Sequence, residues 1–512
     1  MLNDVVRKWS RGMALVTLAV SLITLAAPGN SSAYIGDESV QKPPTSGSYA
    51  YGVYGPNETD FPKIGPIYNT SGTSGADPVF AGKVRRITND FPKPSRSDIY
   101  SKNGFWSADG TLMYHHTPSE TKTIIDTRTG ASVNVPGDYN GFDGSFAPND
   151  PPGGPYTWYF FSGTRLMKYS ISTVNGGTSF AGAGPTAVFD EEDFGEGVTL
   201  GGLGGSVDWI DNSGQRMVLN VNGVVKVWGG TKFYQNVETV DASVVVANGG
   251  WIGISPDGNY VVVSTEDSSG SDQQISYKIN HSAATVQAGK VFWTLCGGHG
   301  DLVSAGDDRT YLVTFDCYGS RFDDLLPAIY AVDVDPERAV SASNDPDSEV
   351  DEAGRNAQRS SNTMLFKTAW GDDGHFSGVS KGALRDWAFI SIESGEDTFG
   401  RVVDGSKRNP EWWTRPYMQE IVMVNVVDGQ VLRVAHHRSR SVFDSYYYQP
   451  RVSASWGDCD GVTAGWLSNF GQLQKNKQGR LMKQPYAGYA DIYAVDVTAV
   501  DVTADPAIAC LP

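Results

Sequence analysis

The sequence predicts an all-β protein, a seven-bladed β-propeller with four strands in each blade. Glycine is abundant, at 59 of 512 residues, and aromatic residues make up 11% of the chain. Few segments have the alanine, leucine, glutamate and lysine content of long helices. A theme of alternating apolar strands joined by polar turns recurs seven times, at spacings of roughly 40 to 70 residues, which is the period of propeller blades with loop insertions.

The clearest copies of this theme, residues 104–116 and 250–265, each hold an Asp-Gly turn between two apolar-alternating runs. Asp-Gly in that context is the strongest short-range signal for a hairpin. Looser copies occur at 142–172, 206–230, 299–335, 385–435 and 451–497. The rival folds are a β-sandwich, which would not need seven similar cassettes, and a β-helix, which would have a shorter period.

The two ends of the chain differ from the repeats. Residues 1–33 carry basic residues, an apolar run and then small residues, the pattern of a secretory signal peptide. The run is short for a membrane span and no later segment is longer, so we expect a secreted or periplasmic protein with no membrane span. We expect residues 34–80 to form an extended arm or linker, residues 81–497 the propeller, and residues 498–512 a C-terminal tail.

The net charge is −18, which makes nucleic acid or an anionic membrane surface an unfavourable partner. An anionic substrate stays compatible with that charge because a local basic funnel can work within an acidic surface. The four cysteines allow three disulfide connectivities. We favour Cys296 with Cys317 and Cys459 with Cys510, because each pair lies in one predicted blade or its tail. Their spacing fits no zinc motif.

Two insertions interrupt the repeats. Residues 341–365 are predicted to form an acidic loop, in which Asp345, Asp347 and Glu349 resemble the start of a calcium loop. The central glycine and terminal glutamate of such a loop are missing, which favours a solvated surface loop. Residues 393–416 form the second insertion, where Trp412 and Trp413 either stack on a sugar or pack within the blades.

Most of the seven histidines fall where a propeller places its binding loops. Arginine, tyrosine and glutamine residues accompany them. Such a set suits a uronate, because arginine or a metal would neutralise the sugar carboxylate while histidine or tyrosine moves the protons. Each of these histidines also has an alternative interpretation as a hydrogen-bonded structural group. No GxSxG, HExxH or Walker-type motif supports another chemistry.

The segments WSADGTLMY, GHGD, HFSG, AHHRSR, YYYQPRVSAS and YADIYAVDV, scattered over residues 84–497, resemble the oligogalacturonate-lyase-like propellers. The resemblance implies a seven-bladed propeller that cleaves uronate polymers by β-elimination, with a divalent metal, usually manganese, held by histidines and a glutamine. Where that family has His-x-His, this chain has Gln449-Pro450-Arg451. Arginine cannot ligate a metal, but it can bind a carboxylate through two parallel hydrogen bonds.

The sequence therefore predicts an exported polysaccharide lyase-like protein that acts on a uronate-containing polysaccharide by β-elimination. The alternative is a non-catalytic exported propeller that binds a glycan or a protein partner. Under the first hypothesis the catalytic residues are His299, His437, Tyr448 and Arg451. The substrate-binding residues are His116, Lys381, Arg385 and Arg438. The metal ligands are His375, His436 and Gln449, with manganese or calcium as the ion and an acidic polysaccharide or oligosaccharide as the partner.

Overall fold

The computed structural model describes residues 36, 38–39, 53–54, 65–66, 79–80, 82–88, 100–115, 123–135, 144–162, 164–174, 179–189, 198–205, 207–266, 272–296, 298–317, 327–340, 352–368, 373–379, 381–393, 416–417, 419–439, 449–458, 461–468, 473–474, 491–498 and 502. They belong to one compact unit, Ser32–Pro512. Several expectations lie outside the described residues. They are the signal peptide, the Cys459–Cys510 pair, the acidic residues 345–351, His116, Tyr448, Trp412 and Trp413.

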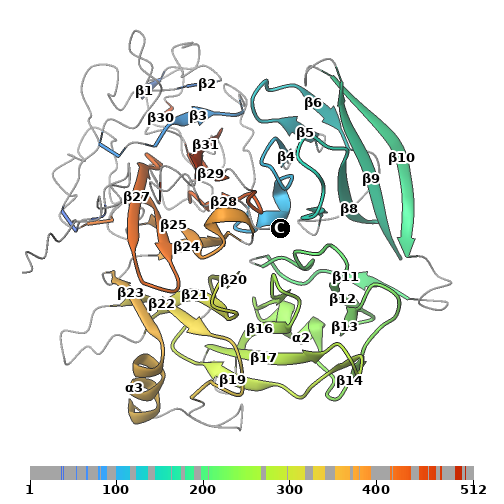
Figure 1. The fold of residues 1–512 in the computed structure, drawn as a ribbon, viewed down its shortest axis with the longest axis vertical. Coiled ribbons are helices and arrows are strands. Elements are labelled where there is room, and N and C mark those ends of the chain that lie inside the picture. The colour runs from blue at the N-terminus through green and yellow to red at the C-terminus, as the bar shows by residue number, and fades with distance from the viewer. Residues whose placement is uncertain are drawn as a thin grey trace, which may run out of the picture. The chain divides into compact units, whose positions relative to one another are not determined.

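The described strands form a seven-bladed β-propeller of antiparallel blades, as the sequence predicts (Figure 1). Blade 1 contains β4 (Leu112–His115), β5 (Thr123–Asp126) and β6 (Ser132–Asn134). Blade 2 contains β7 (Ser145–Phe146), β8 (Tyr156–Ser162), β9 (Arg165–Val174) and β10 (Ser179–Phe189). Blade 3 contains β11 (Leu200–Gly201), β12 (Met217–Val221) and β13 (Val224–Trp228). Single bridges, Trp106 to Met113 and Ile210 to Met217, lie at the inner edges of blades 1 and 3.

The next three blades follow along the chain. Blade 4 contains β15 (Trp251–Ile254), β16 (Tyr260–Glu266), β17 (Asp272–Asn280) and β19 (Lys290–Trp293), extended by β14 (Gln235–Asn236) and β18 (Thr285–Val286). Blade 5 contains β20 (Gly300–Ser304), β21 (Thr310–Asp316), β22 (Ala328–Asp333) and β23 (Thr363–Lys367). Blade 6 contains β24 (Asp373–Gly378), β25 (Trp387–Glu393), β26 (Glu420–Asn425) and β27 (Val431–His436). It begins one strand earlier than the predicted copy at 385–435.

Blade 7 joins distant parts of the chain. It contains β28 (Ser453–Ala454), β29 (Gly461–Ser468) and β31 (Asp491–Thr498), and β3 (Val84–Arg86) and β2 (Gly65–Pro66) complete it. β3 pairs with β31, with Val84 opposite Val495. A buried ion pair between Arg86 and Asp491 reinforces this pairing. A separate parallel pair joins β1 (Val53–Tyr54) to β30 (Leu473–Gln474).

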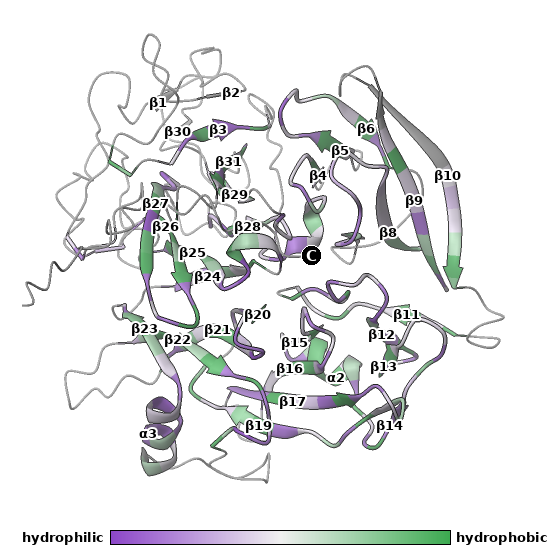
Figure 2. Cartoon of the chain, viewed as in Figure 1, coloured by the Kyte–Doolittle hydropathy of each residue, from purple (hydrophilic) through white to green (hydrophobic). Residues whose placement is uncertain are grey.

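The prediction of a loop over residues 341–365 is wrong in its second half. Glu352–Ser361 forms helix α3, and β23 follows it at once. The helix has no apolar stripe, so the periodicity that reveals most surface helices is missing. It is anchored instead by buried Gln358, whose Oε1 accepts from the backbone N and hydroxyl of Thr294 at 3.1 and 3.2 Å. Figure 2 shows hydrophilic colour along much of α3.

Apolar side chains fill the spaces between blades, in clusters that each draw on adjacent sheets. The predicted Asp-Gly turns also join neighbouring blades. Asp109 accepts from the hydroxyl of Tyr156 at 2.8 Å, and Asp257 accepts from the hydroxyl of Thr310 at 3.0 Å. These turns therefore fix the blades relative to one another as well as reversing the chain.

Short helices complete the described elements: η2 (Asn103–Phe105), α2 (Ala242–Ala247) and η3 (Gly382–Leu384). Asp241 caps α2 by accepting from the backbone N of Val244. Among the described residues, no helix is long and apolar enough to cross a membrane.

Candidate functional site

Ionisable side chains gather where the inner strands of blades 5, 6 and 7 begin. His299 lies just before β20, Asp373 and His375 lie at the start of β24, and Arg451 lies two residues before β28. Inner strands of successive blades run in the same direction, so their starting ends meet on one face of a propeller. The repeat thus brings residues that are far apart in sequence to one place.

His299 and Asp373 form the exposed part of this site. Nδ1 of His299 lies 3.0 Å from Oδ1 of Asp373, and the two side chains are 29% and 48% exposed. Burial acts to raise the pKa of Asp373, but the hydrogen bond from His299 is the largest of several effects that outweigh burial and lower the pKa to about 2. The carboxylate is therefore ionised, and in a neutral imidazole the hydrogen bond to it places the proton on Nδ1 and the lone pair on Nε2.

His375 lies directly against His299. The two ring centroids are 4.4 Å apart with 32° between the planes. Nδ1 of His375 lies 3.1 Å from Oε1 of Glu393, and both side chains are only 2% exposed. Burial lowers the pKa of His375 well below its ordinary value and raises that of Glu393 well above its ordinary value. Burial thus disfavours the charged form of both groups.

The strand register explains why these two residues meet. In the β24–β25 ladder His375 is opposite Ser391, and Asp373 is opposite Glu393. Glu393 is therefore the diagonal neighbour of His375, within reach of a long side chain. The hydroxyl of Ser391 accepts from the backbone N of Val452 at 3.3 Å, so the same side of blade 6 also contacts blade 7.

Arg451 and Tyr100 border the histidines from blade 7 and from the segment before η2. The edge of the Tyr100 ring meets His375 with centroids 5.6 Å apart, and the Arg451 guanidinium lies 5.6 Å from the Tyr100 centroid. Arg451 is buried and has φ of +41°. A non-glycine residue in this left-handed region is strained, and such strain clusters at functional sites.

The loop ahead of His299 is held by the predicted Cys296–Cys317 disulfide, which the structure confirms with a Cα–Cα distance of 5.3 Å. It ties the segment before β20 to the end of β21. The backbone carbonyl of His299 also accepts from the hydroxyl of Thr314 at 2.7 Å. His299 thus lies in a segment that a disulfide and a hydrogen bond hold in place.

His437, predicted to be catalytic, has both ring nitrogens engaged. Nε2 lies 3.1 Å from the carbonyl of Ile392, and Nδ1 accepts from the backbone N of Ser439 at 2.9 Å. Burial lowers the pKa of His437 to about 3. The ring is therefore a neutral connector between β25 and the segment after β27.

The three predicted metal ligands do not form one site. His375 is on β24 and His436 is on β27, and two strands separate them. Three strand spacings amount to about 14 Å, and side chains stand perpendicular to the sheet, so both rings cannot reach one ion. The His436 ring instead contacts the Phe80 ring, with centroids 4.6 Å apart and 35° between the planes. Gln449 has a buried Oε1 with no hydrogen-bond partner among the described residues, and those residues contain no group of three histidine, cysteine or acidic side chains suited to a metal.

Two predicted substrate-binding residues lie past the other end of β24. Lys381 donates to the carbonyl of Pro148, and burial lowers its pKa. Arg385 is exposed and approaches Gly306. Neither is therefore brought to the histidines. Arg438, at the end of blade 6, is buried with φ of +54°.

Three residues of the site were missed from the sequence: Tyr100, Asp373 and Glu393. A signal for Glu393 was present, because Ser391 and Glu393 lie at alternate positions at the end of the otherwise apolar run WAFISIE. Polar residues within a strand that is otherwise apolar indicate a buried hydrogen-bond network rather than a solvent face.

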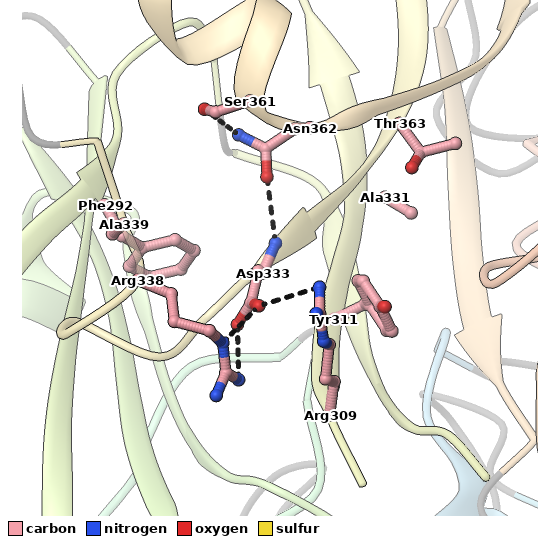
Figure 3. A pocket seen from close by; sticks show the side chains of 10 residues that line it. All are labelled: Phe292, Arg309, Tyr311, Ala331, Asp333, Arg338, Ala339, Ser361, Asn362 and Thr363. Atoms are coloured by element: carbon pink, nitrogen blue, oxygen red, sulfur yellow. Dashed lines mark hydrogen bonds and ion pairs between the residues drawn. The ribbon is translucent and has the colours of Figure 1, made fainter. Parts of the chain in front are cut away.

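A cavity of about 160 Å³ lies at the opposite end of blade 5 (Figure 3). Arg338 binds Asp333 through two hydrogen bonds of 2.7 and 3.0 Å and also contacts Asp335 at 2.8 Å. Arg309 approaches Asp333 at 3.7 Å. The charged groups of this cavity are thus paired with one another, which gives it no distinctive ligand chemistry.

The fold and the site define a seven-bladed propeller with a histidine–carboxylate cluster on one face. The chain matches no protein-family model and no curated protein. Among solved structures it is similar to an oligogalacturonate lyase from Vibrio parahaemolyticus, with 12% identity, a TM-score of 0.41, and coverage of 81% of this chain and 94% of that one.

It is also similar to an oligogalacturonate lyase in complex with manganese, at 13% identity and a TM-score of 0.40, covering 81% of this chain and 93% of that one. A luciferin-regenerating enzyme matches at 12% identity and a TM-score of 0.34, over 70% of this chain and 98% of that one. These likenesses are weak.

Proposed function

We propose that this protein is an exported polysaccharide lyase that cleaves a uronate-containing polysaccharide by β-elimination, with His299 as the general base. The observation that carries the proposal is the pairing of His299 with ionised Asp373. That pairing leaves Nε2 of a partly exposed imidazole as a proton acceptor, and among the described residues Nε2 has no hydrogen-bond partner. A base oriented in this way by a carboxylate is the usual device for proton abstraction.

The reaction balances with the groups at hand. Nε2 of His299 takes the proton from the carbon next to the uronate carboxylate. The electron pair forms a carbon–carbon double bond, the glycosidic C–O bond at the β carbon breaks, and the leaving oxygen takes a proton from the protonated base or from water. Arg451 is buried, so its charge would stabilise the negative charge that develops on the carboxylate through the protein interior and not by direct contact. No step requires a metal ion.

Export and domain organisation belong to the same proposal. The Cys296–Cys317 disulfide supports an oxidising compartment, because such bonds rarely persist in the cytosol. We propose residues 1–33 as the signal peptide and residues 81–497 as the propeller domain that carries the site, to which β2 of the preceding segment adds one short strand.

A second candidate is a non-catalytic propeller that binds a glycan or a protein partner. The burial of His375 and Arg451 favours it, because neither side chain is accessible to a ligand in this structure. Under this hypothesis the histidine cluster stabilises a binding face and moves no protons.

Incubation with a panel of uronic-acid polysaccharides, with and without EDTA, manganese or calcium, separates the candidates. We expect the absorbance of an unsaturated uronate product to rise for the wild type with EDTA present, and not for His299→Ala or Asp373→Asn. His281→Ala is the matched control, because His281 is hydrogen-bonded to Tyr234 and Asn259 in blade 4, away from the site. Glycan binding without any such product would support the second candidate instead.

A further inference from the structure

We propose that Glu393 is a positioning residue for His299: by holding the ring of His375 through Nδ1, it fixes the surface on which the base lies. The inference rests on the proposed function, because it assigns Glu393 a role in the same proton transfer. Glu393 does not touch the substrate in this scheme, and its effect passes entirely through His375.

The contacts form a continuous series. Oε1 of Glu393 lies 3.1 Å from Nδ1 of His375, and the His375 ring contacts the His299 ring with centroids 4.4 Å apart and 32° between the planes. Asp373 holds the far side of His299 at 3.0 Å. The candidate base is therefore oriented by two restraints, a hydrogen bond at its edge and a ring against its face.

The orientation of His375 depends on Glu393. Among the described residues, the bond to Glu393 is the only hydrogen bond of the His375 imidazole, since its buried Nε2 has no partner there. The His375 ring also contacts Tyr100, in the segment before η2, but this is an edge contact that resists rotation of the His375 ring only weakly. Without Glu393 the His375 ring can turn about its Cβ–Cγ bond, and His299 loses the ring contact that supports it.

The pair is costly for a purely structural role. Both side chains are almost fully buried, His375 within β24 and Glu393 at the end of β25. Packed hydrophobic residues in place of a buried polar pair are often as stable or more stable, so its stability alone does not explain the pair. A role in positioning His299 does explain it.

Glu393→Leu and Glu393→Gln test the proposal on the full-length mature protein. We expect Glu393→Leu to lower kcat by roughly 10- to 100-fold, the range that a misplaced catalytic group produces, with KM unchanged. Glu393→Gln should restore most of kcat, because an amide can still hydrogen-bond to Nδ1. Glu337→Leu makes the same chemical change at an exposed position and should have no effect. A wild-type kcat for Glu393→Leu would overturn the proposal.

A double-mutant cycle with His375→Phe tests whether Glu393 acts through His375. Phenylalanine preserves a flat ring but has no Nδ1, and the double variant leaves no buried unpaired carboxyl group that could prevent folding. We expect Glu393→Leu to lower kcat no further in the His375→Phe background. Additive losses would show that Glu393 acts by another route and would overturn the inference.

A measurement without turnover separates this inference from the proposed function. In protein labelled with nitrogen-15 on histidine, Glu393→Leu should shift the ring resonances of both His375 and His299, whereas Glu337→Leu should shift neither. If no polysaccharide is cleaved but the His299 resonances shift, the positioning is correct and the lyase function is wrong. If the His299 resonances stay at their wild-type positions in Glu393→Leu, the positioning proposal fails whatever the activity.

Discussion

The side-chain amide of Asn103 donates to the backbone carbonyl of Gly378 at 2.6 Å, across 275 residues of sequence. The same amide donates to the carbonyl of Ser455 at 3.1 Å, and the backbone N of Asn103 donates to Asp208 at 2.8 Å. One residue of η2 therefore joins blades 3, 6 and 7 at their inner strands. The inner strands that carry the candidate site are thus fixed from within the ring.

Asn103→Leu should destabilise the protein strongly. The substitution leaves two buried carbonyl groups without their donor, and each unsatisfied buried group costs about 1–3 kcal/mol. Urea unfolding followed by tryptophan fluorescence should show the loss in the free energy of unfolding. Asn134→Ala, at an exposed position of β6, should change it by less than about 0.5 kcal/mol. Equal losses for the two variants would contradict the role assigned to Asn103.

Asp208→Asn should change how stability depends on pH. Burial raises the pKa of Asp208 from 3.8 to about 6, although Lys102 and two backbone N–H groups act against it. A raised folded-state pKa stabilises the protein fully below pH 3.8, and that contribution is lost as pH rises through 6. The shift corresponds to about 3 kcal/mol.

The measurement is the free energy of unfolding from pH 4 to pH 8 for both proteins. The wild type should lose stability relative to Asp208→Asn between pH 4 and pH 6, and the two curves should run parallel above pH 7. Parallel curves over the whole range would mean that Asp208 keeps an ordinary pKa in the folded protein.

Arg86→Leu should weaken the closure of the ring in blade 7. It leaves the buried carboxylate of Asp491 without its ionic partner, and breaking a buried pair costs about 3–5 kcal/mol. The hydroxyl of Thr88 would remain as a donor to Asp491. Arg85→Leu is the neighbouring control, because its partner Asp496 is 56% exposed and surface pairs contribute about 0–1 kcal/mol. Thermal unfolding should rank the two variants in that order, and the reverse order would contradict this account.

Arg451→Gly should be more stable than Arg451→Ala. Arg451 has φ of +41°, where glycine has no steric penalty and alanine costs about 1–2 kcal/mol. At Ser453, in the extended strand β28, the order should reverse, with the glycine variant about 0.5–1 kcal/mol less stable than alanine. Chemical unfolding of the four variants checks both differences. Neither Arg451 variant should cleave uronate polymers, because the cation is lost in both.

The architecture was predictable from the sequence because its signals are local. Each blade carries its own alternation and turns, and an Asp-Gly pair such as Asp109-Gly110 specifies a hairpin whatever the rest of the chain does. The pairing of β3 with β31 has no such signal, because three residues at 84–86 carry too little pattern to identify a partner far along the chain. The sequence did not predict helix α3, because this helix is held by hydrogen bonds of Gln358 and has no apolar stripe with a helical period.

The site was predictable only in part. His299 and His375 stand out because histidine is rare in this chain, and the structure brings them into contact. For other residues, closeness in sequence to a site histidine did not mean closeness in the structure. Lys381 follows His375 by six positions but lies past the far end of the strand, and His436 lies on the outermost strand of the same blade. Which end of a strand, and which strand of a blade, a residue occupies depends on register, which the sequence does not reveal.

The pairing of β3 with β31 also sets an order of events in folding. Arg86 and Asp491 are 405 residues apart, so nearly the whole chain must be synthesised before β3 meets its partner. Until then one edge of β3 and one edge of β31 present unpaired backbone groups to any other strand. Contacts of such long sequence separation slow folding. The blades between them can form in sequence during synthesis, but the circular molecule becomes complete only at its final strand.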